Sequence, residues 1–208
     1  MKFNRRDTIV KELKHHLPFT LGVSLLAGVL VALAFIFDFA SNGFLGNMFE
    51  VIHPLHVLVS AAATAAIFRK YKKGVFVAGL IGVVGAILIG TISDVLLPWI
   101  AGNIFSLETS LHLPIVEEPL LILGVAVIGA LVGIYIGLFK LNHSLHVFFS
   151  VFASLFYLLA FSVEIGVWAI LANSLVVFLV VYIPCCISDI VFPIFFIKKP
   201  CHDCGHWH

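Results

Sequence analysis

The chain has 208 residues, of which 62% are hydrophobic and only 11% are charged, and its formal net charge is +1. A soluble globular domain is nearer half apolar and a quarter charged, so this composition excludes an ordinary water-soluble fold and requires lipid as part of the solvent. The near-neutral charge gives no reason to expect a nucleic-acid partner.

The apolar residues gather in runs that are long enough to cross a bilayer, which takes about 20 residues each. Six such runs predict membrane spans at residues 17–37, 48–68, 74–98, 115–139, 143–163 and 165–197. The last run is too long for one straight span, and Pro184 and Pro193 are expected to break it. We therefore predict an all-α integral membrane protein with six transmembrane helices.

The basic residues lie at both ends of the chain and in the loops after the second and fourth predicted spans. They are Lys2, Arg5, Arg6, Lys11, Lys14, Arg69, Lys70, Lys72, Lys73, Lys140, Lys198 and Lys199. The opposite loops carry only acidic charges, at Asp38, Glu50, Glu108 and Glu164. By the positive-inside rule, this distribution predicts a plasma-membrane or inner-membrane protein with both termini in the cytoplasm.

The sequence also contains an internal repeat. HPLHV at 53–57 returns as HSLHV at 143–147, Ser60 and Thr64 return as Ser150 and Ser154, and ISDV at 92–95 returns as ISDI at 187–190. Each copy holds three predicted spans, and an odd number forces the second copy to face the other way. The predicted organisation is a cytoplasmic basic segment at 1–16, a first unit at 17–100, an extracytoplasmic connector at 101–113, an inverted second unit at 114–197 and a cytoplasmic tail at 198–208.

Two of the repeated residues are aspartates within apolar helices, where a carboxylate costs about 2.5–3.5 kcal/mol and marks a functional site by default. The repeated histidines are three residues apart and share a helix face. The topology predicts an outer cluster of His53, His56 and Asp94, and an inner cluster of His143, His146 and Asp189, with Ser93 and Ser188 as neighbours. Both clusters approach the midplane if the proline-broken helix ends bend inward.

Two imidazoles and a carboxylate suit zinc and other divalent first-row metals. Two other readings stay open: the histidines bond neighbouring helices, or the aspartates orient the imidazoles without binding metal.

Further candidate ligands lie outside these clusters. The tail offers two cysteines and two histidines that can complete a tetrahedral shell, namely Cys201, Cys204, His206 and His208. Cys185 and Cys186 adjoin Asp189. His112, Glu117 and Glu118 open the fourth span and predict an outer vestibule that attracts cations, although acidic residues also suit an ordinary helix start.

Together these patterns predict a transporter, not an enzyme, for a divalent transition-metal cation. Zinc is favoured, and transport is by alternating access between the inverted units. The alternatives are a membrane metalloenzyme or a haem or electron-transfer protein, both using the intramembrane histidines, and a carrier or channel for a non-metal solute. The expected partners are the bilayer, the metal ion and a second copy of the chain, which would pack on small-residue stripes such as Gly129, Gly133 and Gly137.

Overall fold

The computed structural model describes residues 5–37, 41–71, 74–105, 107–136, 139–162 and 167–186. These residues form α-helices and one π-helical turn, and there is no strand among them. The elements are α1 (Arg5–Ile36), α2 (Asn42–Tyr71), α3 (Val75–Thr91), η1 (Ile92–Leu96), α4 (Leu97–Ile104), α5 (Pro114–Glu117), α6 (Pro119–Ile136), α7 (Phe139–Ala160) and α8 (Val167–Cys186). The fold is therefore all-helical, as the sequence predicted.

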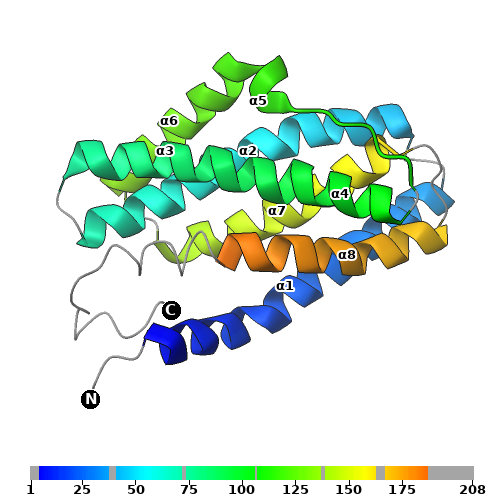
Figure 1. The fold of residues 1–208 in the computed structure, drawn as a ribbon, viewed down its shortest axis with the longest axis horizontal. Coiled ribbons are helices and arrows are strands. Elements are labelled where there is room, and N and C mark those ends of the chain that lie inside the picture. The colour runs from blue at the N-terminus through cyan, green and yellow to red at the C-terminus, as the bar shows by residue number, and fades with distance from the viewer. Residues whose placement is uncertain are drawn as a thin grey trace.

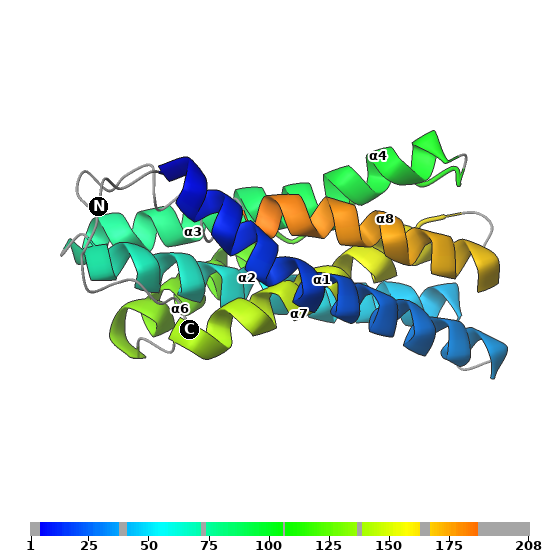
Figure 2. The same cartoon turned by 90° about the horizontal axis from the view of Figure 1, so that it is seen from below.

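The long helices run back and forth along the long axis of the molecule (Figure 1). α1 crosses one side of the bundle and packs on α7 and α8, as the view from below shows (Figure 2). α2 lies in the middle and contacts α3, α6 and α7. α2 and α7 carry the equivalent histidines of the repeat, so their packing brings the two halves of the sequence together.

The third and fourth predicted spans are interrupted or extended in the structure. The third was predicted to end at residue 98, but α3, η1 and α4 continue it to Ile104. Pro98 falls in the first turn of α4, directly after the π-helical turn, where the regular hydrogen-bond ladder is already interrupted. The fourth was predicted to be one helix, but it breaks at Glu118, because a residue before proline is disfavoured in the helical region.

Four helices of the described chain are long and apolar enough to cross a membrane, over Leu17–Ala34, Gly43–Arg69, Val75–Ile104 and Pro119–Ile136. Shorter apolar stretches lie at Leu145–Ala160 and Ser174–Cys185. Large apolar side chains point outward along α1, α3 and α6, among them Leu26, Leu80 and Leu120. Such a surface is compatible with contact to lipid.

Glycines allow α6 to lie directly on α2. A Cβ atom at Gly129 or Gly133 would collide with the backbone carbonyl of Leu58 or Ala62, so both positions require glycine. Two members of the predicted small-residue stripe thus pack within the chain, as in other closely packed membrane helices. Gly137 lies outside the described residues. Because Gly129 and Gly133 are covered by α2, they are not available to contact a second copy of the chain, and the homo-oligomer stays a prediction.

The connector that follows α4 is fastened to the end of α7. Ser110 N donates to Phe161 O (2.9 Å), and Tyr157 Oη donates to Ser110 O (3.1 Å). The same phenol accepts from His112 N (3.1 Å). These bonds fix the connector backbone on both sides of residue 111 and hold His112 at the end of the bundle where α2 begins.

Candidate metal site

The centre of the site is a carboxylate shared by two imidazoles. His53 and His56 lie on one face of α2, and their Nδ1 atoms are 2.9 and 2.5 Å from Oδ2 of Asp94. All three side chains are buried, with 2% or less of the side chain exposed. The structure thus brings together the three residues that the sequence grouped in the outer cluster.

Asp94 is presented by the π-helical turn η1. A π turn is wider than an α turn and often occurs at functional sites, where it leaves a backbone carbonyl without its usual partner. Here Ser154 Oγ on α7 donates to the carbonyl of Ser93 (3.0 Å), and Ser93 Oγ donates to Oδ1 of Asp94 (2.8 Å). The turn therefore fixes the direction of the carboxylate. Nothing in the sequence pattern predicted it.

The second half of the sequence completes the environment of Asp94. Ser150 Oγ on α7 donates to Oδ1 of Asp94 (2.9 Å), and the Cys185 thiol of α8 lies 3.4 Å from Ser150 Oγ. Oδ1 then accepts from two hydroxyls and Oδ2 from two ring nitrogens. Because an ionised carboxylate only accepts, each Nδ1 donates to it, and in a neutral imidazole the lone pair then lies on Nε2.

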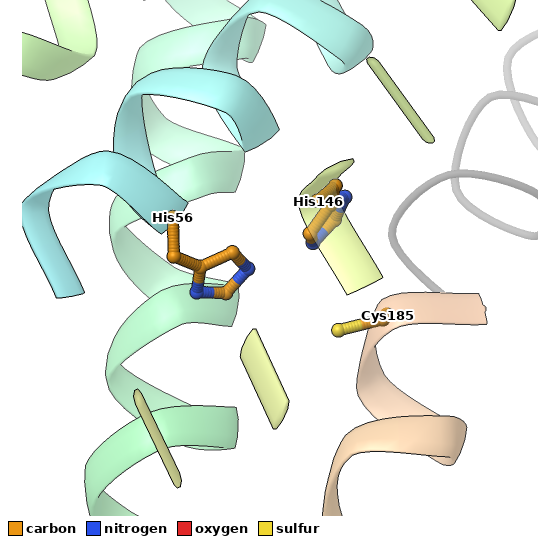
Figure 3. A group of neighbouring side chains, drawn as sticks. All are labelled: His56, His146 and Cys185. Atoms are coloured by element: carbon orange, nitrogen blue, oxygen red, sulfur yellow. The ribbon is translucent and has the colours of Figure 1, made fainter. Parts of the chain in front are cut away.

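A second group of potential ligands adjoins the first and shares His56 with it. The side chains of His56, His146 and Cys185 point toward one another from α2, α7 and α8 (Figure 3), and one ligand atom of each lies within 4.8 Å of the others. The two rings are 4.7 Å apart at their centroids and inclined by 32°. All three residues are fully buried. Two nitrogens and a sulfur form a ligand set suited to zinc and softer metals.

This arrangement differs from the predicted separation of the clusters. His146 was expected in an inner cluster, yet it contacts His56 of the outer one. α2 and α7 pack on each other through the faces that carry the repeated motif, so equivalent histidines meet. The side chains of His143 and Cys186 lie outside the part of the chain that the structure describes. The same holds for the whole of Ser188, Asp189 and the tail ligands Cys201, Cys204, His206 and His208. The predictions for all of these residues stay predictions.

The two halves of the repeat differ at one position beside the imidazoles. Cys185 stands where the first unit has Gly90, by the offset that relates Asp94 to Asp189. A Cβ atom at Gly90 would lie 3.7 Å from Cε1 of His53 and 3.8 Å from Nδ1 of His56. The first unit therefore has bare backbone next to its histidines. The second unit supplies a thiol there, although the sequence placed Cys185 outside both predicted clusters.

A different cluster occupies the end of the bundle where α2 begins. His112 Nε2 is 2.6 Å from Oε1 of Glu50, and its Nδ1 is 2.9 Å from Oε2 of Glu117. Both carboxylates are more than one-third exposed. Glu50 was missed as a partner, because 62 residues separate it from His112 and no periodicity connects them. Glu118, predicted in the same vestibule, is exposed.

Phe49 separates the two histidine clusters. Its ring stacks on His53 at a centroid distance of 5.3 Å and meets the edge of His112 at 5.8 Å. Tyr157 and Phe161 enclose the same ring, which is fully buried. An apolar side chain thus stands between the buried cluster and the more exposed one.

Comparison of the chain with protein-family models, with curated proteins and with solved structures finds no match. The chemistry of the site is therefore the basis on which a function is inferred.

Proposed function

We propose that this chain transports a divalent transition-metal cation, with zinc favoured, by alternating access between two inverted three-helix units. One observation carries the proposal: a candidate ligand group spans the two units, because His56 of the first unit converges with His146 and Cys185 of the second. A cation bound there contacts both units, so movement of one unit against the other would change its set of ligands. Full burial of the group keeps water from competing for the cation.

The proposed topology has six spans with both termini in the cytoplasm. Support comes from the four long apolar helices, the two shorter apolar stretches in α7 and α8, and the basic residues on one side of the predicted spans. Binding residues at the interface of two repeats, near the middle of the membrane, are typical of secondary transporters built from inverted repeats. A nitrogen and sulfur ligand set favours zinc among the common divalent cations.

The test is zinc flux into proteoliposomes that contain the purified full-length chain and a trapped fluorescent zinc indicator. We expect flux above that of empty liposomes, its loss in His56→Gln, and its retention in the matched variant His112→Gln. No flux from the wild-type chain in either gradient direction, with protein inserted and monodisperse before reconstitution, would contradict the proposal.

A membrane metalloenzyme is the second candidate, because the group of His56, His146 and Cys185 offers three ligands and leaves a fourth position for water. An enzyme retains its metal, whereas a transporter exchanges it with metal in solution. Exchange of bound zinc with radioactive zinc therefore separates the two candidates. Haem is disfavoured in this conformation, because the rings of His56 and His146 contact each other and leave no room for a porphyrin between them.

A further inference from the structure

We infer that the metal binds to Nε2 of His56, a ring nitrogen of His146 and the thiolate of Cys185, and that Asp94 orients the histidines without binding the metal. This restricts the metal to those that accept thiolate readily, such as zinc, cadmium or cobalt, and excludes manganese, magnesium and calcium. The inference deepens the proposed function by naming the class of its substrate. Its test uses binding alone, so it stands or falls separately from transport.

The hydrogen-bond capacity of Asp94 is already filled. Each carboxylate oxygen already accepts two hydrogen bonds, Oδ2 from the two rings and Oδ1 from Ser93 and Ser150. A carboxylate offers about four lone-pair sites in total. Asp94 would have to release at least one of these buried donors to coordinate a cation, whereas as an acceptor it is fully used.

The hydrogen bond to Asp94 fixes the orientation of the His56 ring. Its Nδ1 donates to Asp94, so Nε2 carries the lone pair in the neutral ring that binds a metal. This nitrogen is buried and makes no hydrogen bond with any described residue. A buried polar atom without a partner is unfavourable, and a bound cation removes that cost. A histidine that donates one ring N–H to a carboxylate and binds metal through the other nitrogen is the common arrangement in metal proteins.

The thiol of Cys185 determines which metals suit the site. Cys185 is fully buried and directed toward His56 and His146 (Figure 3). Thiolate ligands select zinc and softer metals over magnesium, calcium and manganese, which prefer oxygen. When the metal binds, the thiol gives up its proton and the sulfur forms the bond to the cation. Two nitrogens and one sulfur leave a fourth position of a tetrahedral metal open.

The experiment is optical titration of the purified full-length chain with cobalt(II), in a Cys201→Ser/Cys204→Ser background that removes the tail thiols. Cobalt bound by thiolate shows a sulfur-to-cobalt charge-transfer band in the near ultraviolet. We expect this band in the background protein, its loss in Cys185→Ser, and its retention in the control His112→Gln. Cadmium should remove the band by displacing cobalt, and manganese should not.

Asp94→Asn tests the positioning role of Asp94, because the charge-transfer band itself comes from Cys185. If Asp94 orients His53 and His56, the variant keeps the charge-transfer band and binds cobalt about 10–100-fold more weakly. An unchanged band in Cys185→Ser, or a band that vanishes in Asp94→Asn at saturating cobalt while the protein stays monodisperse, would overturn the inference. Binding as expected without zinc flux in liposomes would keep this site and reject only the transport proposal.

Discussion

Two clusters of histidine and carboxylate lie on either side of Phe49, and the ratio of histidines to carboxylates is reversed between them. In the buried cluster one carboxylate, Asp94, accepts from two imidazoles. In the other cluster one imidazole, His112, lies between the carboxylates of Glu50 and Glu117. The same two functional groups are present in both places, yet they are left with different chemistry.

The difference lies in which lone pairs remain. Of the two histidines that share Asp94, His56 keeps a buried ring nitrogen without a hydrogen-bond partner, which can bind a metal. A histidine between two carboxylates has both ring nitrogens engaged and leaves neither of them free for a metal. The first cluster is therefore suited to bind a cation, whereas the second ties the connector and α5 to α2. Proximity of histidine and carboxylate alone does not identify a metal site.

The largest effect is expected from removing the shared acceptor. Asp94→Leu leaves two buried ring N–H groups and two hydroxyls without their acceptor, at about 1–3 kcal/mol for each group that stays unsatisfied. We expect the free energy of unfolding in mixed micelles to fall by about 3–6 kcal/mol on this ground. A loss below about 1 kcal/mol would mean that the Asp94 hydrogen bonds contribute no more than an exposed ion pair does.

Phe49→Ala should remove the barrier between the clusters. Deleting a buried ring leaves a cavity, and we expect a loss of about 3 kcal/mol, at the low end for such a change because the surrounding aromatic rings can relax. Water that enters the cavity reaches His53, so its modification by an imidazole-specific reagent should rise severalfold by mass spectrometry. Phe49→Leu is the control, because it retains most of the volume and should leave His53 protected. Equal protection of His53 in all three proteins would contradict the role of Phe49.

The smallest effect is expected at the exposed cluster. His112→Gln removes two contacts to carboxylates that are 39% and 50% exposed, and each contact of this kind contributes less than about 1 kcal/mol. The free energy of unfolding should therefore change little in the same micelle assay. A loss as large as that of Asp94→Leu would show that the two clusters are energetically alike and remove the basis of the comparison.

Much of the first cluster was predictable from the sequence. The spacing of His53 and His56 placed both on one helix face, and the topology put Asp94 at the same depth. The repeat also drew attention to Ser150 and Ser154. Within one of the predicted three-helix units, periodicity and chain direction are enough to group residues, because the helices are consecutive in the chain.

Contacts between the units were not predictable in the same way. The contact of His56 with His146, the approach of Cys185 and the bond from Ser150 to Asp94 all depend on which faces of α2, α7 and α8 meet. A repeat shows that two segments are equivalent, but not that they touch. Nor does any sequence pattern reveal the extra residue of a π-helical turn, whose position at Asp94 sets the direction of the carboxylate.

The most direct test of the account is the zinc content of two histidine variants, His56→Gln and His112→Gln, each made in the full-length Cys201→Ser/Cys204→Ser background. Zinc is added in slight excess, the protein is dialysed, and the metal per chain is measured by elemental analysis. We expect one zinc per chain in the background protein and in His112→Gln, and none in His56→Gln. Equal zinc in both variants, or loss only in His112→Gln, would contradict the assignment of metal binding to the buried cluster.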